Sequence, residues 1–269
     1  MNDASIGIFD SGMGGLTVMR ALLDRLPNEN FVYLGDTARL PYGTKSGETV
    51  LRYARQAADA LMQREVKLLV IACNTASAYA LLALQTAIPS VPVVGVIEPG
   101  AEAACAAAPK GRIAVIATEG TVNGGAYTRA IKQRNASASV IQKACPLFVP
   151  MAEEGLTDGE IAAVIAHHYL APLRSERPDC LVLGCTHFPV LKNAIRDVIG
   201  SEIAIVDSAA TTARAVEAIL KSRKLARNGS AGGERTFLVT DAPERFARAG
   251  QIFLGTPIDP AAVELIDLR

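Results

Sequence analysis

The sequence predicts an α/β fold with two similar, pseudo-symmetric domains, each a doubly wound parallel sheet, and a functional site in the cleft between them. Three observations lead to this prediction. Short apolar runs alternate with segments of helix length, and the runs recur at nearly the same intervals in the two halves of the chain. The third run of each half ends in a cysteine, Cys73 and Cys185. Such alternation is typical of parallel sheets that helices cover on both faces.

The predicted strands are runs rich in Val, Ile and Leu with few polar residues between them. Strands that are buried on both faces have this composition. Segments with apolar residues at helical spacing, such as 49–65, separate the runs. The runs span residues 5–10, 31–36, 67–73, 92–98, 112–118, 137–145, 180–185, 202–208 and 235–241.

The intervals between these runs indicate an internal duplication. Counted from Ile6, the next runs of the first half lie 26, 67 and 88 residues further on. Counted from Ile113, the corresponding runs of the second half lie 27, 72 and 92 residues further on. Similarity at matching intervals is the mark of a repeated structural unit.

The duplication places the two domain boundaries. We expect residues 1–98 plus 208–269 to form the first domain and residues 99–207 to form the second. The segment after residue 208 then packs back onto the first domain, and the glycine-containing stretch 227–234 is predicted to be a loop.

Composition excludes several classes of function. Lys+Arg and Asp+Glu number 27 each, so no overall field favours nucleic acid. The N-terminus "MNDASIGIFD" has no basic and apolar leader, and the five cysteines are too few and too scattered for a disulfide framework. Residues 68–97 carry no charge, but Asn74, Pro89 and Pro92 interrupt them. We therefore expect a cytoplasmic protein with reduced thiols and without a membrane span.

Ligands of parallel sheets bind outside the carboxyl ends of the strands, where Cys73 and Cys185 both lie. Taken singly, each is a small apolar residue of a type that is often buried. Cys105, Cys145 and Cys180 keep that interpretation. As a pair facing one cleft, Cys73 and Cys185 are open to other uses, which include a disulfide, a zinc site with His187, and a hydrolase with one nucleophilic thiol.

Inversion at a carbon atom is the chemistry that uses both thiols. One base removes a proton from one face, and a conjugate acid returns a proton to the other. A thiol titrates near pH 8.5, so it can take either part. The polar pairs Asn74–Thr75 and Thr186–His187 are expected to cap the helices that follow and to present N–H groups to a substrate carboxylate.

Five motifs resemble those of glutamate racemases, which supply D-glutamate for the peptidoglycan of bacterial cell walls. They are "FDSGMGG", "LGDTARLPYG", "ACNTAS", "PLFVPMAEEG" and "LGCTHFPVL". The resemblance runs from about Ile6 to Asp207. It implies an isomerase that acts on L- and D-glutamate without a cofactor or a metal. A homodimer stays open, because members of the family differ in dimer arrangement and in allosteric control.

The resemblance also assigns roles to residues. Cys73 and Cys185 match the two acid/base thiols, which act on the D- and the L-isomer respectively. Asp10 matches the carboxylate that assists Cys73, and His187 with Glu153 matches the pair that assists Cys185. The positions that match substrate-binding residues are Asp10, Ser11, Tyr42, Gly43, Asn74, Thr75, Thr186 and His187.

Each of these residues also has a purely structural interpretation. Asp10 would cap the helix that follows "DSG", and Asp36 would end a strand and cap a turn. His187 would be a hydrogen-bonded turn residue. The glycines of "SGMGG" would hold a dinucleotide only if Thr17 were a third glycine, so dinucleotide binding is disfavoured.

Other functions remain open from the sequence. A racemase for aspartate or hydantoins would share the cysteine pair. A two-lobed amino-acid-binding protein would close on a similar ligand, but it would not need a thiol on each side. A thiol-redox protein is disfavoured because the sequence has no CxxC. Only five residues precede Ile6, so we expect basal activity without a cell-wall precursor as activator.

Overall fold

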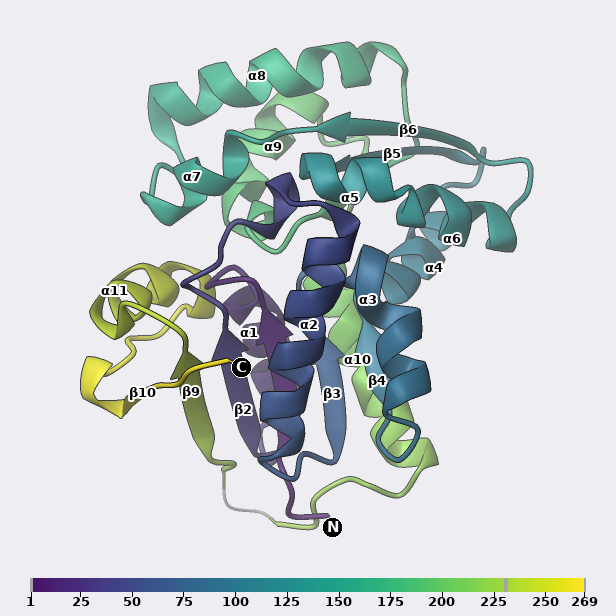
Figure 1. Ribbon diagram of the computed structural model, residues 1–269. Coiled ribbons are helices and arrows are strands. Elements are labelled where there is room, and N and C mark those ends of the chain that lie inside the picture. Colours follow the sequence, from purple (N-terminus) through teal and green to yellow (C-terminus); the bar gives the residue numbers. More distant parts are fainter. Residues whose placement is uncertain (1, 230–231, 269) are drawn as a thin grey trace.

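The computed structural model describes residues 2–229 and 232–268, and within them ten strands form two parallel sheets (Figure 1). The first sheet has the order β10-β9-β2-β1-β3-β4 and the second the order β6-β5-β7-β8. The strands of the first are β1 Ile6–Asp10, β2 Phe31–Gly35, β3 Leu68–Ile71, β4 Val93–Gly95, β9 Arg235–Val239 and β10 Val263–Leu265. Those of the second are β5 Arg112–Ala117, β6 Ser139–Ala144, β7 Cys180–Gly184 and β8 Ala204–Asp207.

Helices lie on both faces of each sheet (Figure 1). The α-helices are α1 Leu16–Arg25, α2 Gly47–Met62, α3 Asn74–Ala87, α4 Ile97–Ala107, α5 Glu119–Gly124, α6 Ala126–Arg134, α7 Phe148–Glu153, α8 Gly159–Ser175, α9 Lys192–Ile199, α10 Ser208–Ser222 and α11 Pro243–Leu254. Short 3-10 helices are η1 Tyr42–Thr44, η2 Phe188–Leu191 and η3 Pro260–Ala262. None of the helices in the described ranges is both long and apolar enough to cross a bilayer.

The strand order confirms the predicted fold class. The order β2-β1-β3-β4 of the first half recurs as β6-β5-β7-β8 in the second. The register agrees as well, because Phe9 of β1 lies opposite Ile71 of β3 and Ala117 of β5 lies opposite Gly184 of β7. Each half is therefore the same arrangement of four strands, as the intervals in the sequence predict.

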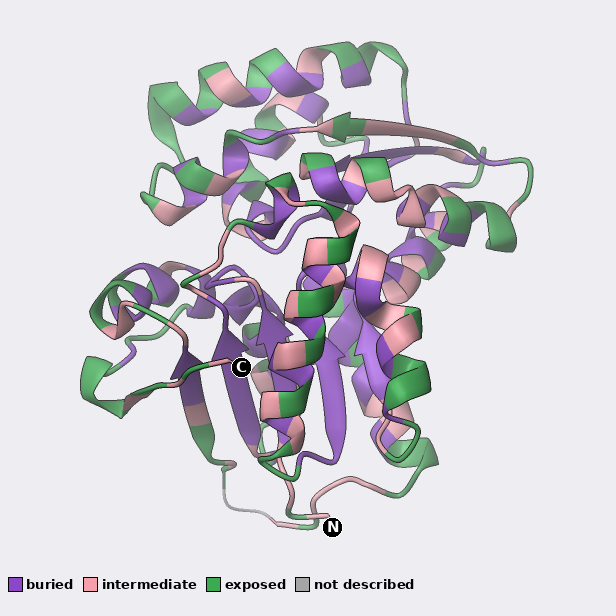
Figure 2. Cartoon of the chain, in the orientation of Figure 1, coloured by how far each residue is buried: buried purple, intermediate pink, exposed green. Residues whose placement is uncertain are grey.

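The two faces of the first sheet bury different side chains. Phe9, Leu34 and Ile71 pack with the buried residues of α2 and α3, while Ile8 and Tyr33 belong to the core on the side of α1. Alternation along each strand sends neighbouring residues to opposite faces, and both faces are covered. The strands of this sheet are accordingly buried along most of their length (Figure 2).

The chain crosses between the two sheets at two places. The first crossing is helical rather than a loop, because α4 begins at Ile97 directly after β4 and packs against β7 and β8. The second crossing is at Ser208, where β8 ends and α10 begins. Strand β9 then pairs with β2, so the C-terminal segment returns to the first sheet. The exact domain boundaries stay a prediction.

Two parts of the C-terminal segment differ in how well the sequence predicts them. The stretch 227–234 has no helix or strand at 227–229 and 232–234, and Ser230 and Ala231 lie outside the described residues. Strand β10 is not predicted, because three residues flanked by "PAA" and "ID" carry no strand pattern of their own. It forms because the edge of β9 offers unpaired backbone groups.

A buried ion pair holds the amino ends of the strands together, and its removal gives the first prediction. Lys67 Nζ lies 2.5 Å from Glu29 Oε2, and both side chains are almost fully buried. Replacement of Lys67 by Met would leave the Glu29 carboxylate buried without its cation, so Lys67→Met should lower the free energy of unfolding by about 3 kcal/mol. Denaturant titration measures it. Lys221→Met, which breaks an exposed pair with Glu217, should cause no measurable change; equal effects would contradict this account.

Candidate active site

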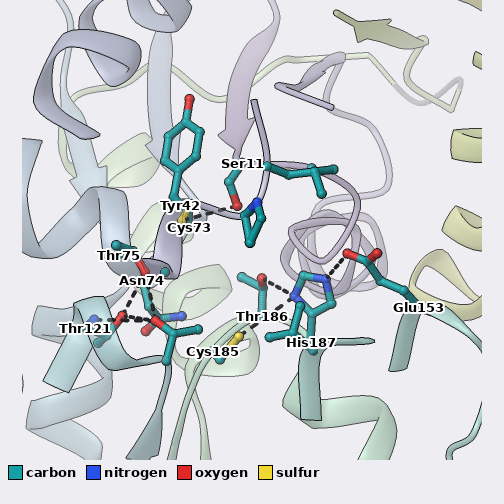
Figure 3. Close-up of a pocket in the computed structure, with 16 residues that line it drawn as sticks. Ser11, Tyr42, Cys73, Asn74, Thr75, Thr121, Glu153, Cys185, Thr186 and His187 are labelled. Atoms are coloured by element: carbon teal, nitrogen blue, oxygen red, sulfur yellow. Dashed lines mark hydrogen bonds and ion pairs between the residues drawn. The ribbon is translucent and has the colours of Figure 1, made fainter. Parts of the chain in front are cut away.

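One pocket lies where the carboxyl ends of the two sheets face each other (Figure 3). The space between its lining atoms, including its opening to solvent, is about 420 Å³. Cys73 and Cys185 approach it from different sheets. Its lining residues are Ser11, Gly12, Leu40, Pro41, Tyr42, Gly43, Cys73, Asn74, Thr75, Thr118, Thr121, Val149, Glu153, Cys185, Thr186 and His187.

Cys73 occupies the N-cap of α3. Its sulfur accepts a hydrogen bond from the Ala76 N–H at 3.4 Å and lies 3.6 Å from the Ser11 hydroxyl oxygen, to which the thiol donates. Burial, together with the negative charge of Asp10, raises the pKa of Cys73 to about 12. The thiol of Cys73 therefore carries its proton near neutral pH.

The caps differ from the sequence prediction in both halves. The N-cap of α3 is Cys73 itself, so Asn74 and Thr75 are its first helical residues. After Cys185 the chain forms the 3-10 helix η2, where His187 makes no side-chain cap bond. Pro189 in the first turn of η2 lacks an N–H group, so this start has one donor fewer for a side chain to cap. The expected capping roles of Asn74–Thr75 and Thr186–His187 are wrong.

Cys185 belongs to a chain of three side chains. Its sulfur lies 3.8 Å from His187 Nδ1, and His187 Nε2 lies 3.1 Å from Glu153 Oε1. Burial lowers the pKa of His187, but the hydrogen bonds with Cys185 and Glu153 outweigh burial and raise it to about 10. The pKa of Glu153 is lowered: burial opposes this, and His187 and Arg245 cause it. The pocket thus holds an imidazolium beside Cys185.

The C-terminal segment contacts both His187 and Glu153, and no pattern in the sequence predicts these contacts. Arg245 Nη2 on α11 lies 3.3 Å from Glu153 Oε2. The ring of Phe253, also on α11, packs edge-on against His187 with 5.1 Å between ring centroids. Both residues lie more than fifty positions beyond His187, in a part of the chain that carries no motif.

Asp10 lies next to the pocket rather than in its lining. It is fully buried, and one of its oxygens accepts the Gly12 N–H at 3.0 Å. Burial raises the pKa of Asp10, against the opposing effect of the His187 charge and of nearby backbone N–H groups. Helix α1 begins with Gly15 as its N-cap and has no side-chain cap bond. The interpretation of Asp10 as a helix cap is therefore wrong.

The remaining predicted residues line the pocket, but they present different groups. The hydroxyl of Tyr42 donates to Asp36, which also accepts bonds from Arg39 and Thr240. The Tyr42 ring points away from the cavity (Figure 3). Gly43 faces Thr118, because a Cβ at Gly43 would lie 2.7 Å from the Cβ of Thr118. Asp36 is thus a buried structural acceptor that holds the loop containing Tyr42.

Thr118 and Thr121 line the pocket and were missed from the sequence. Their hydroxyls each lie 3.0 Å from that of Thr75, which joins the second half of the chain to the first. The duplication could have identified Thr118. Thr118 follows β5 as Ser11 follows β1, and the register places these residues beside Cys185 and Cys73. Thr121 has no counterpart of this kind.

Close backbone approach brings the halves together at the pocket. A Cβ on Gly14 would lie 2.3 Å from His187 Nδ1 and 2.6 Å from Thr186 Oγ1. The hydroxyl of Thr17, the residue that interrupts the glycine pattern, lies 2.9 Å from the Thr186 carbonyl oxygen. Across the described ranges, no group of three or more His, Cys, Asp and Glu side chains is arranged to hold a metal ion.

The fold and this pocket define an α/β protein with two thiols opposed across a small-molecule site. The sequence model of the Asp/Glu/Hydantoin racemase family matches residues 6–216, and the chain belongs to this family.

Within this family, the chain is similar to glutamate racemases. A glutamate racemase from Geobacter metallireducens is 55% identical over 251 residues, which are 93% of each chain. The crystal structure of glutamate racemase isoform RacE1 from Bacillus anthracis is 36% identical, covers 100% of this chain and 99% of its own, and has a TM-score of 0.95. That of Francisella tularensis glutamate racemase in complex with D-glutamate is 36% identical with the same coverage and a TM-score of 0.93.

The Glu153–His187 contact predicts a direct change in titration. Glu153→Gln removes a negative charge that raises the pKa of His187, so the imidazolium should lose its proton at a pH lower by about one unit or more. The chain has three histidines, and NMR of the labelled imidazole rings follows each one. Glu154→Gln, at the exposed neighbouring position, should leave the His187 midpoint near pH 10. A His187 midpoint that is equal in both variants would contradict the assigned contact.

Proposed function

We propose that this protein interconverts L- and D-glutamate without a cofactor, with Cys73 and Cys185 as acid/base thiols on opposite faces of the substrate Cα. The observation that carries the proposal is the presence of one thiol from each sheet in a single buried pocket. That the protein is an amino-acid racemase follows from its family, and the relatives at 36–55% identity are glutamate racemases. An aspartate or hydantoin racemase is therefore disfavoured.

The two thiols meet different surroundings, which gives each its role. With L-glutamate, Cys185 takes the Cα proton while the His187 imidazolium 3.8 Å away stabilises the charge on its sulfur. Cys73, whose pKa of about 12 keeps it protonated, delivers a proton to the other face. With D-glutamate the roles exchange, and Asp10 assists Cys73. Glu153 orients His187 through their hydrogen bond.

Polar groups around the thiols account for substrate binding. The first turn of α3 presents backbone N–H groups and the positive end of the helix dipole to the pocket, which suits a carboxylate. Ser11, Asn74, Thr75 and Thr186 offer hydroxyl or amide groups in the same lining. Tyr42 and Gly43 contribute backbone, because the Tyr42 hydroxyl is taken by Asp36.

The cellular role follows from the reaction. D-Glutamate made in this way would supply peptidoglycan synthesis in the cytoplasm. A reducing compartment suits a mechanism that needs two free thiols. Whether the chain acts as a monomer or a homodimer stays a prediction, as do the domain ranges 1–98 plus 208–269 and 99–207.

Racemisation followed by circular dichroism tests the proposal. Wild-type protein should convert each glutamate enantiomer to the racemate and should act far less on aspartate. Cys73→Ser and Cys185→Ser should each lose racemisation by at least about a thousandfold, because a hydroxyl is a poor acid/base group near neutral pH. Cys180→Ser is the control, since this buried thiol donates to the Ala104 carbonyl outside the pocket. Near-normal turnover in either active-site variant excludes the two-thiol mechanism.

Hydrogen isotopes separate two bases from one. In heavy water, L-glutamate should lose its hydrogen to Cys185 and receive deuterium from Cys73, which has already exchanged with solvent. Early D-glutamate should then carry deuterium at Cα while unreacted L-glutamate keeps protium. Mass spectrometry of the separated enantiomers measures both. A single base that served both faces would return some original hydrogen to the product, and such transfer would refute opposed thiols.

A further inference from the structure

A tyrosine from the second half of the chain reaches an amide of the first half at the pocket. Tyr127 lies on α6, and its hydroxyl donates to Asn74 Oδ1 on α3 at 2.8 Å. The Tyr127 side chain is fully buried and does not line the pocket. It is therefore placed to act on the pocket only through Asn74.

Asn74 has one free donor group. Its side chain lines the pocket and is labelled there in Figure 3, with only 3% of the residue exposed. Its Oδ1 is taken by Tyr127, and in the part of the chain that the structure describes Nδ2 is buried without a hydrogen-bond partner. A buried donor without a partner costs about 1–3 kcal/mol, which a ligand acceptor would restore.

The direction of the Tyr127 bond decides which end of the amide is available. If Nδ2 were bonded to Tyr127, Oδ1 would face the pocket and would repel a carboxylate. Burial, and after it the charges of Cys185 and Asp207, raises the pKa of Tyr127, so the phenol keeps its proton. A protonated phenol can donate to Oδ1 and thereby leave Nδ2 for a ligand.

Tyr127 is also held at the two points where the chain crosses between the sheets. A Cβ on Gly100, in the crossing helix α4, would lie 3.2 Å from the Tyr127 oxygen. Ser208, at the second crossing, lies near the Tyr127 phenol, and its own hydroxyl donates to the Leu183 carbonyl. The ring itself packs on Gly184, whose Cβ would lie 3.0 Å from it. A change in the relation of the two halves would therefore move Tyr127 relative to Asn74.

We propose that Tyr127 is a positioning residue that fixes the Asn74 amide with Nδ2 toward the substrate α-carboxylate, and that it does so only while the two halves of the chain are closed on each other. This inference rests on the proposed racemase function. Substrate binding would then depend on contact between the two halves of the chain. The second half completes a carboxylate site that is built mainly from the first.

Tyr127→Phe tests the proposal, because it removes the hydroxyl and leaves the ring. KM should rise about five- to tenfold for both enantiomers, since Asn74 would bind the carboxylate common to both, while kcat changes less than threefold. Tyr169→Phe is the matched control: Tyr169 is buried in the same half, and its oxygen accepts the Leu147 N–H at 3.3 Å. It should keep the wild-type KM. An unchanged KM in Tyr127→Phe, or a loss in kcat alone, overturns the proposal.

A double variant keeps the test decisive if Tyr127→Phe folds poorly. Asn74→Ala removes the amide, and Asn74→Ala with Tyr127→Phe removes both partners and leaves no orphan group. The proposal expects the same KM in both, because Tyr127 acts through Asn74. A further threefold rise in the double variant would show another route and overturn it. If wild-type protein racemises a different amino acid, the proposed substrate fails, and the same comparison with that substrate still decides the role of Tyr127.

Discussion

The structure depends on how closely two sheet edges approach each other. Any side chain at Gly14 would collide with His187, and any at Gly43 would collide with Thr118. This closeness removes water from ionisable groups, which is why burial is the first cause of the raised pKa values of Cys73 and Asp10. In such a place each charge needs a nearby partner, and the pair His187 and Glu153 supplies one for the other.

The sequence predicts the architecture well because each strand has its own local pattern of apolar residues. Runs buried on both faces need continuous apolar residues, and equal intervals between such runs predict equal strand order. The same order then places Cys73 and Cys185 at one edge. The motif resemblance adds residues such as Ser11 and Glu153, and the structure brings these to the pocket.

The parts that the sequence misses are set by contacts between distant segments. Thr121 and Arg245 reach the site from helices whose local pattern is ordinary. Strand β10 exists only because β9 has a free edge. The predicted caps are wrong because α3 begins one residue earlier than Ser, Thr or Asn preference suggests, which makes Cys73 itself the N-cap, and because His187 makes no side-chain bond at the N-cap of η2. At these positions, the packing of distant segments outweighs the capping preference of individual residues.

The two thiols occupy corresponding positions in the duplicated halves, but the charged residues around them differ. Ser11 and Cys73 correspond to Thr118 and Cys185, yet the position of Asp10 at the end of β1 is occupied by Ala117 at the end of β5. Burial, and after it the charge of Asp10, raises the pKa of Cys73, whereas the imidazolium of His187 lies beside Cys185.

Because of this asymmetry, the two thiols differ in their charge surroundings before substrate binds. In the mechanism proposed above, the proton held on Cys73 and the imidazolium beside Cys185 prepare the pocket to take a proton at Cys185 and to give one at Cys73. In that mechanism, one turnover of L-glutamate leaves Cys185 protonated and Cys73 deprotonated, so the thiols must exchange protons with solvent before the next L-substrate. The charge of His187 also lowers the pKa of Asp10, so the two assisting groups are electrostatically coupled. In the proposed mechanism, a duplicated scaffold thus catalyses a reversible reaction through two half-sites that differ in charge, and part of this difference arises at a repeat position that is Asp10 in the first half and Ala117 in the second.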